Sequence, residues 1–262
     1  MREDILAGKT VIDSGRLVRR IEEALKDEGV ALDGDTVLRS RTFAESVTQQ
    51  GQLHGFDEVL DWFERKRRDC AMRVRPVGLN ELPEWSMDEK TATIRHRSGQ
   101  FYCVMGVQVT GASGREVLSW SQPLLQQHEG GILGILCKRF GGVMHYLLQA
   151  KAEPGNVGTV LLSPTLQATW SNLRRFHGGK KTQFAEYFEE PDPERVIFSR
   201  EYAEDGGRLY LKSNRNMLVE VAPDEPVAAA EDFIWVTLYQ IKRLLRYDNL
   251  VNPHVRSIIS YL

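Results

Sequence analysis

The chain has 262 residues, 42% of them hydrophobic and 27% charged, and this ordinary balance excludes a disordered or fibrous protein. Its formal net charge of -2 offers no overall attraction for nucleic acid or anionic lipid, so any phosphate binding must be local. A chain of this length buries roughly 70–75% of its surface on folding, and we favour one sizeable domain over two small ones.

Three cysteines, Cys70, Cys103 and Cys137, are scattered along the chain, and their odd number argues against a disulfide framework. Residues 1–10 lack a basic, apolar signal sequence, and no apolar run approaches the roughly 20 residues that a membrane span needs. We therefore expect a protein of the reducing cytoplasm that binds neither membranes nor nucleic acid.

The first part of the chain predicts two helices joined by a connector. From Ser14, apolar residues follow helical spacing as far as Gly29, and the charged opposite face favours a packing or dimerisation helix over a site. Turn-forming glycine and aspartate residues make 29–42 a connector. A second helix is predicted over 56–68, and its basic end complements the helix dipole rather than indicating a nucleic-acid site.

Short segments separated by glycine-containing turns begin near residue 93 and predict a mixed, β-rich α+β domain. The predicted strands are 93–97, 100–109, 132–139, 142–153, 157–162, 165–170, 195–200 and 207–221. Helices are predicted over 181–189 and 231–246, and Pro253 opens a last short segment.

One face of the predicted strand 142–153 is unusually polar. Side chains in a strand point alternately to opposite faces, so Gln149, Lys151 and Glu153 share one face while the residues between them are alanines. A half-exposed edge strand alternates in the same way, so this strand by itself leaves both interpretations open.

Two later segments repeat this feature. The predicted strand 165–170 alternates hydroxyl and amide side chains with apolar ones, and Lys212, Asn214 and Asn216 share a face of the last strand, where Arg215 breaks the alternation as a bulge would. Solvated strand faces usually carry Lys, Glu and Thr rather than Gln and Asn, so the three strands together predict a polar groove. Such a groove suits a ligand rich in hydroxyl, carbonyl and phosphate oxygens, such as a nucleotide-linked sugar.

Motifs for other chemistries are missing from the sequence. The six histidines have no HExxH or paired spacing, there is no Glu-rich box, and no Walker A motif or GxSxG elbow occurs. None of the three cysteines lies in a recognisable nucleophile motif. We therefore predict no catalytic metal.

Four separated segments resemble, in the same order, the NDP-hexose 2,3-dehydratase family of deoxysugar biosynthesis. These segments are Ser119-Trp120-Ser121-Gln122-Pro123, residues 149–156, residues 163–172 and Lys212-Ser213-Asn214-Arg215-Asn216. The likeness runs from about Phe43 to the C-terminus, which divides the chain into an N-terminal helix and connector over 1–42 and one module over 43–262. The resemblance implies a Nudix-like α+β fold with a mixed β-sheet and flanking helices, used without the Nudix metal box.

The resemblance also implies a function: loss of water across C2–C3 of an NDP-4-keto-6-deoxyhexose, with a thymidine-diphosphate sugar as substrate. Family members that make 2,6-dideoxysugars are typically about twice as long, with two such modules in tandem, so we expect two copies of this chain to pair as a homodimer. A 3-ketoreductase is the expected functional partner. The alternatives are a protein that binds nucleotide sugars without turnover and, more distantly, a Nudix-type hydrolase.

The implied reaction needs a general base, an oxyanion stabiliser and a general acid, the acid–base contributions being typically about 10²- to 10⁴-fold each. The C4 ketone acidifies the C3–H, an enolate forms, and the C2 hydroxyl leaves, so no redox cofactor is needed and we predict no cofactor. Glu153 and His145 are the candidate proton carriers, and Lys151 is a candidate for stabilising the enolate or binding the diphosphate. A structural Lys151–Glu153 ion pair and a histidine at the edge of the core are the alternatives for these residues.

The candidate substrate-binding residues lie in or near the four segments and carry amide, hydroxyl, guanidinium or aromatic groups. They are Trp120, Gln122, Gln149, Asn156, Gln167, Thr169, Asn172, Arg208, Asn214, Arg215 and Asn216. Arg208 and Arg215 are favoured for the diphosphate, because guanidinium binds phosphate in a bidentate fork. The alternatives are that Gln122 and Gln167 satisfy buried backbone groups, that Asn156 is a turn residue, and that Trp120 is a core residue.

Overall fold

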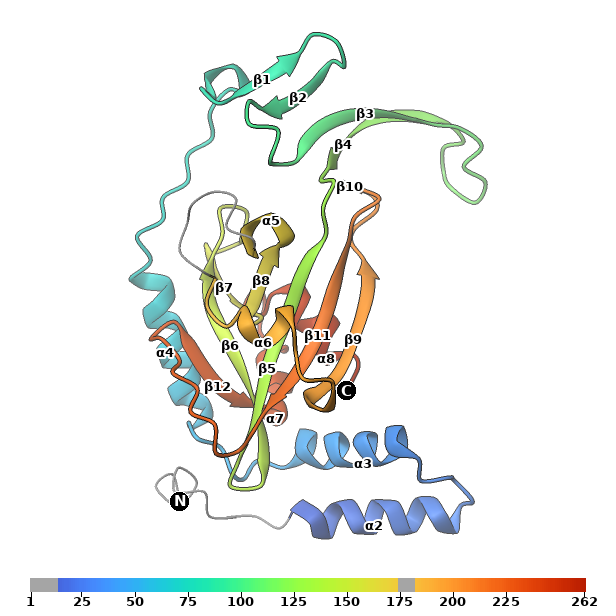
Figure 1. Cartoon of the computed structure of the whole chain (residues 1–262), viewed down its shortest axis with the longest axis vertical. Coiled ribbons are helices and arrows are strands. Elements are labelled where there is room, and N and C mark those ends of the chain that lie inside the picture. Colours follow the sequence, from blue (N-terminus) through green and yellow to red (C-terminus); the bar gives the residue numbers. More distant parts are fainter. Residues whose placement is uncertain (1–13, 174–181) are drawn as a thin grey trace.

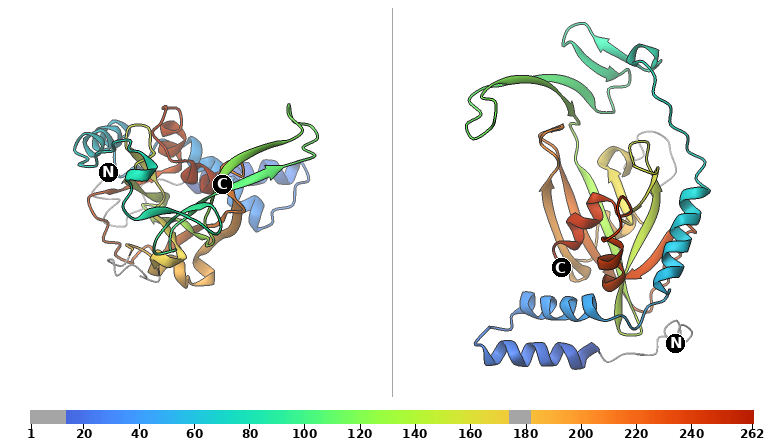
Figure 2. Two further views of the ribbon diagram at one scale, coloured as in Figure 1. Left: turned by 90° about the horizontal axis from the view of Figure 1, so that it is seen from above. Right: turned by 180° about the vertical axis from the view of Figure 1, so that it is seen from behind.

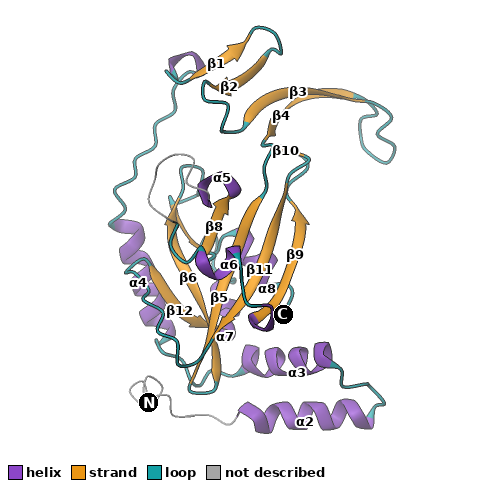
Figure 3. Ribbon diagram, viewed as in Figure 1, coloured by secondary structure: helices purple, strands orange, loops and turns teal. Residues whose placement is uncertain are grey.

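The computed structural model describes residues 14–173 and 182–262, which fold into two mixed β-sheets with helices around them (Figures 1 and 3). In the view of Figure 1 the larger sheet forms the body of the molecule, the smaller sheet lies above it, and two helices lie below it. Both sheets contain parallel and antiparallel pairs. The predicted α+β class, with a mixed sheet and flanking helices, is therefore confirmed.

The larger sheet is organised around strand β5 (Gly131–Phe140). Its strand order is β12 (Phe233–Thr237), β6 (Val143–Ala152), β5, β11 (Ser213–Val221) and β9 (Val196–Ala203), while β7 (Val160–Ser163) pairs with β6 and β8 (Leu166–Thr169) pairs with β5. β11 runs parallel to β5, and the other pairs are antiparallel. Both faces of β5 are buried along most of its length, which explains its nearly continuous apolar sequence.

The smaller sheet is connected to the larger one through two of its strands. Its order is β1 (Trp85–Asp88), β2 (Thr93–His96), β3 (Cys103–Val109), β4 (Trp120–Gln126) and β10 (Leu209–Tyr210). β4 leads into β5 and β10 leads into β11, and both of these pairs, β4 with β10 and β5 with β11, are parallel. The two sheets are therefore joined at the place where the β4–β10 pair meets the larger sheet (Figure 1).

Helices enclose two hydrophobic cores on the larger sheet. Helices α4 (Phe56–Arg68), α7 (Leu238–Leu244) and α8 (Pro253–Ile259) contribute to one core, and α7 and α8 lie against the sheet in the rear view of Figure 2. Two short helices, α5 (Trp170–Leu173) and α6 (Glu186–Glu189), contribute to the other core. The remaining helices are α2 (Ser14–Asp27), α3 (Gly34–Val47) and the 3-10 turns Leu79–Glu81 and Pro193–Arg195. In the described part of the chain, no helix has both the length and the apolar character to cross a membrane.

The helix predicted over 56–68 is confirmed with the same bounds, and the predicted strands recur with their ends shifted by a few residues. The helix predicted over 231–246 is wrong in its first half, because Phe233–Thr237 form β12. Helix α7 begins only after Thr237, whose hydroxyl accepts the backbone N–H of Gln240 at 3.3 Å. Apolar runs of this kind fit a buried strand as well as a helix, and pairing with β6 decides between them.

The predicted connector over 29–42 is also wrong, because most of it belongs to α3. Asp33, which looks like a turn residue in the sequence, caps this helix by accepting the backbone N–H of Thr36 at 2.8 Å. The division of the chain at residue 42 stays a prediction.

Strands β1 and β4 were not predicted, and the bulge expected at Arg215 is not where the sheet is irregular. The chain instead turns at Leu211, which has a positive φ of 50°, so that the predicted strand 207–221 is divided into β10 and β11. The irregularity in the pairing of β11 with β9 lies further on, between Leu218 and Val219.

The larger sheet divides at Thr165, in the two-residue link between β7 and β8. β5 and β6 pair from Cys137 and Tyr146 to their shared turn, but the next rung, between Leu136 and Leu147, is missing. The Thr165 hydroxyl takes its place, because it accepts the Leu136 N–H at 2.9 Å and donates to the Leu147 carbonyl. Beyond this point β6 pairs with β7 and β5 pairs with β8, so β5 and β6 diverge.

Removing the Thr165 hydroxyl tests this branch point. We expect Thr165→Val to lower the free energy of unfolding by about 1–3 kcal/mol, because a buried N–H and a buried carbonyl lose their partner. Thr165→Ser keeps the hydroxyl and is the matched control, for which we expect a smaller loss. Urea denaturation measures both variants, and a valine variant as stable as the wild type would contradict the role of the hydroxyl.

Candidate active site

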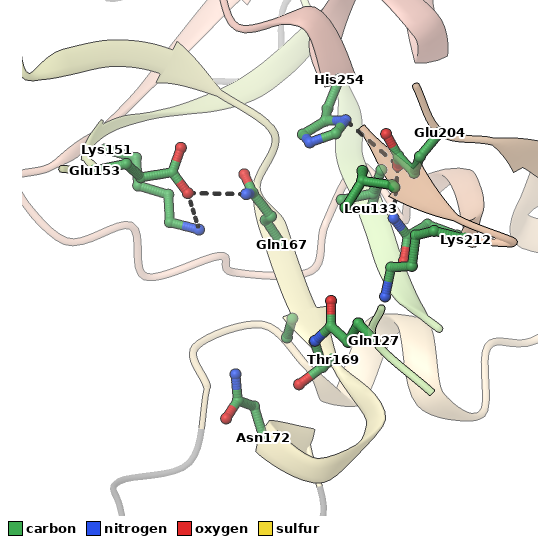
Figure 4. Close-up of a pocket in the computed structure, with 13 residues that line it drawn as sticks. Gln127, Leu133, Lys151, Glu153, Gln167, Thr169, Asn172, Glu204, Lys212 and His254 are labelled. Atoms are coloured by element: carbon green, nitrogen blue, oxygen red, sulfur yellow. Dashed lines mark hydrogen bonds and ion pairs between the residues drawn. The ribbon is translucent and has the colours of Figure 1, made fainter. Parts of the chain in front are cut away.

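A pocket of about 360 Å³ lies where β5 and β6 diverge. Its walls come from the end of β6, from β8, from the start of β5 and β11, and from α8 (Figure 4). Most of its lining side chains are amides or charged groups, and it is lined by Gln127, Leu133, Lys151, Glu153, Gln167, Ala168, Thr169, Asn172, Glu204, Leu209, Lys212, Asn214 and His254. The predicted polar groove therefore corresponds to a real pocket in the fold.

One wall of the pocket carries an ion pair between Lys151 and Glu153. The Lys151 Nζ lies 3.5 Å from Oε1 of Glu153, and Nε2 of Gln167 donates to the same oxygen at 2.9 Å (Figure 4). Burial lowers the pKa of Lys151, and the neighbouring Glu153 carboxylate opposes this shift. Lys151 is therefore an ammonium group that gives up its proton more readily than an exposed lysine.

The opposite side of the pocket carries a second couple, His254 and Glu204. The His254 Nδ1 lies 3.9 Å from Oε1 of Glu204, and Nδ2 of Asn214 donates to that same oxygen. His254 lies in the first turn of α8, where the side chain of Asn252 accepts its backbone N–H at 2.9 Å. Burial lowers the pKa of His254, the carboxylates of Glu204 and Glu153 raise it, and Lys151 lowers it further.

Lys212 supplies a further positive charge to the pocket. Its Nζ donates to the backbone carbonyl of Glu129, and burial lowers its pKa. The Glu129 carboxylate in turn accepts the backbone N–H of Ser171 at 2.8 Å and also the Ser171 hydroxyl. These contacts link Lys212 through Glu129 to the start of α5, and two of its three ammonium hydrogens remain for other acceptors.

The pocket brings together six of the candidate catalytic and substrate-binding residues predicted from the sequence. These are Lys151, Glu153, Gln167, Thr169, Asn172 and Asn214. The alternation predicted for β6 is present, since Leu148, Ala150 and Ala152 pack in the first core while Lys151 and Glu153 line the pocket.

His145, the second candidate proton carrier, lies outside the pocket. Its side chain is fully buried, its Nδ1 donates to the Val143 carbonyl at 3.0 Å, and its Nε2 accepts the Leu53 N–H at 3.3 Å. Burial lowers its pKa to about 4. The structure therefore favours a neutral histidine that links two chain segments over a proton carrier for substrate.

Four other candidates make structural contacts away from the pocket. Trp120 Nε1 donates to Oε1 of Gln122 at 2.7 Å, and Nε2 of Gln122 donates to the Gly207 carbonyl at 2.9 Å, which ties β4 to the turn before β10. Asn156 donates to the Thr159 carbonyl at 3.2 Å within a turn. Gln149 lies further back in β6, at a position where that strand pairs with both β7 and β12.

The residues favoured for the diphosphate are also absent from the pocket lining. The side chain of Arg208 is 83% exposed and pairs with Asp205 at 3.3 Å. Arg215 pairs with Glu201 at 3.5 Å and lies over the Trp170 ring. The Asn216 side chain is buried and donates to the backbone carbonyl of Asn214 at 3.0 Å. Lys212 is the cation of this segment that reaches the pocket.

Sequence reasoning missed Gln127, Glu204 and His254 as pocket residues. The order Asn252-Pro253-His254 does signal a helix start, since Asn is a good cap and Pro suits the first helical position. That signal is local and does not say which pocket the helix faces. In the part of the chain that the structure describes, no group of three or more metal-ligating side chains lies together.

Several proteins of known structure are similar to parts of the chain. An ADP compounds hydrolase is 12% identical in sequence to this chain, with a TM-score of 0.39. The match covers 61% of this chain and 83% of the hydrolase chain. An Ap4A hydrolase of C. elegans is 14% identical in sequence, with a TM-score of 0.28. That match covers 50% of this chain and 91% of the hydrolase chain. These TM-scores are low, and the fold class rests on the two sheets described above.

Two curated proteins share much more sequence with this chain than these hydrolases do. The dTDP-4-dehydro-6-deoxy-alpha-D-glucopyranose 2,3-dehydratase of Amycolatopsis orientalis is 41% identical over 226 residues, which are 85% of this chain and 48% of the relative. The enzyme of the same name from Saccharopolyspora spinosa is 40% identical over 199 residues, which are 76% of this chain and 40% of the relative. The chain thus spans about half the length of the curated relatives it matches.

A family model described as NDP-hexose 2,3-dehydratase matches residues 56–262. This range contains every strand of both sheets and every residue that lines the pocket. It also contains the four segments whose resemblance is described above. The chain belongs to the NDP-hexose 2,3-dehydratase family.

Proposed function

We propose that this protein removes water across C2–C3 of a dTDP-linked 4-keto-6-deoxyhexose. The observation that carries the proposal is the half-buried Lys151–Glu153 pair in a pocket lined by amides and charged groups, within a chain of the 2,3-dehydratase family. The relatives act on the dTDP-linked 4-dehydro-6-deoxyglucose of their name, which supports this substrate for the present chain.

The reaction is an elimination in which no electrons are gained or lost overall. A base takes the C3 proton, and the electrons of the C3–H bond move to the C4 oxygen as an enolate. When the C4 carbonyl re-forms, a C2–C3 double bond forms and the C2 hydroxyl leaves with a proton as water. The site must therefore supply a base, positive charge or donors for the C4 oxygen, and an acid for the leaving hydroxyl.

Lys151 is suited to the acid step. Its burial favours loss of the proton, and Glu153 keeps the ammonium group in place beside the pocket. Gln167 and Asn214 provide amide groups for sugar hydroxyls and the C4 oxygen. Lys212 provides a positive charge for the diphosphate. In this assignment Glu153 holds Lys151 in position and does not itself carry the proton.

Turnover of the substrate tests the proposed function. Incubation with dTDP-4-keto-6-deoxyglucose, a 3-ketoreductase and NADPH should oxidise NADPH, measured by absorbance, and yield a product that has lost one water and gained two hydrogens, measured by mass spectrometry. The reductase is included because the enol at C3 tautomerises to a 3-ketone, which such an enzyme consumes. Binding of dTDP in calorimetry without any turnover would contradict the lyase and identify a nucleotide-sugar-binding protein.

Removing the positive charge at Lys151 should slow the elimination by about 10²- to 10⁴-fold, the usual contribution of a general acid, with little change in thermal stability. Lys66→Met is the matched control for Lys151→Met. Both lysines are 25% exposed and ion-paired, but Lys66 pairs with Asp232 at 2.8 Å outside the pocket. Equal rates for the Lys151 and Lys66 variants, measured in the coupled assay, would argue that the Lys151–Glu153 pair is only structural.

We also propose that two copies of the chain form a homodimer. Exposed apolar side chains on and beside the smaller sheet support this, among them Met87, Val117 and Leu118. Sedimentation velocity should give the mass of two chains at micromolar concentration, and Leu118→Asp should shift the equilibrium towards single chains. Sedimentation as one chain at every concentration would contradict the dimer.

A further inference from the structure

The elimination moves two protons, and the Lys151–Glu153 pair accounts for only one of them. The base must remove a proton from carbon while the acid protonates an oxygen on the neighbouring carbon, so the two groups approach the sugar from different positions. His254 and Glu204 face this pair across the pocket, with Gln167 between the two couples in Figure 4. Among the residues that the structure describes, no other histidine lines the pocket.

The surroundings of His254 resemble those of an imidazole that accepts a proton. The Glu204 carboxylate lies 3.9 Å from Nδ1, where it stabilises the imidazolium that forms when the ring takes up a proton at Nε2. Asn214 donates to this carboxylate and so fixes its orientation. The side chains of His254 and Glu204 are 25% and 19% exposed, so both reach the pocket while most of their surface is removed from water.

We propose that His254 is the general base that removes the C3 proton and that Glu204 is its positioning residue. This inference rests on the proposed elimination. The imidazole Nε2 forms a bond to the proton as the C3–H bond breaks, and the electron pair moves to the C4 oxygen. Lys151 then gives its proton to the C2 hydroxyl, so one water leaves and the positive charge has moved from Lys151 to His254.

The charges around His254 predict how the reaction depends on pH. Burial and Lys151 lower its pKa from the ordinary value of 6.5, while Glu204 and Glu153 act in the opposite direction, and the net shift is downwards. The neutral imidazole is the active form of a base, so kcat/KM should rise with pH through a value below 6.5 and level off near neutrality. The measurement is the pH profile of the coupled assay.

Exchange of the C3 hydrogen with deuterium oxide separates the two proton transfers. We expect His254→Gln to lose both exchange and elimination by about 10²- to 10⁴-fold, because the base acts first. Lys151→Met should keep the exchange and lose the elimination, because the acid acts second. His128→Gln, an exposed histidine outside this pocket, is the control and should match the wild type in both.

Glu204→Gln tests the positioning role without removing the base. Loss of the carboxylate removes a charge that raises the imidazole pKa, so the rise in kcat/KM and the NMR titration of His254 should both move to lower pH. A residue that only stabilises the fold would leave both unchanged. The NMR titration needs no turnover, so it tests Glu204 even where the His254 variant folds poorly.

The outcomes separate this inference from the proposed function. A wild-type protein with neither exchange nor elimination overturns the lyase and the base together. A wild-type protein that performs both, alongside a His254→Gln variant that exchanges C3 deuterium at the same rate, overturns only the base. Unchanged titration of His254 in Glu204→Gln overturns the positioning role.

Discussion

A single side-chain hydroxyl occupies the place where the main sheet divides. Thr165 stands in for the missing backbone rung between Leu136 and Leu147, and it does so with one accepted and one donated hydrogen bond. Pro164, which has no N–H, precedes it in the link between β7 and β8. Because the backbone groups at the branch are satisfied, β5 and β6 can separate inside the core without leaving buried polar groups unpaired.

The pocket forms where these two strands separate. The pKa values of its charged groups are shifted because the pocket is partly closed to water. Lys151, Lys212 and His254 all have their pKa lowered by burial, yet each has a nearby oxygen acceptor. The pair of half-buried Arg139 and buried Glu45 provides a contrast within the same protein. That pair, at 2.9 Å, fastens α3 to β5 and lies outside the pocket.

Much of the fold and part of the site could be predicted from local patterns. Helix α4, the strand alternation of β6 and the apolar run of β5 follow from side-chain periodicity, which needs only neighbouring residues. The errors occurred where one pattern fits two structures. The segment 231–246 is apolar enough for a helix or a buried strand, and Asp33 is as suitable for a turn as for a helix cap.

The sequence by itself determined the family, the α+β class and the alternating polar face that ends in Lys151 and Glu153. Only the tertiary structure decided which polar residues meet. It placed His145 in the core and His254 beside Glu204, although no local pattern says which of the two histidines reaches a pocket. The physical reason is that periodicity specifies which side of its own element a residue faces. The partners across a pocket depend on how strands that are distant in sequence pair and diverge.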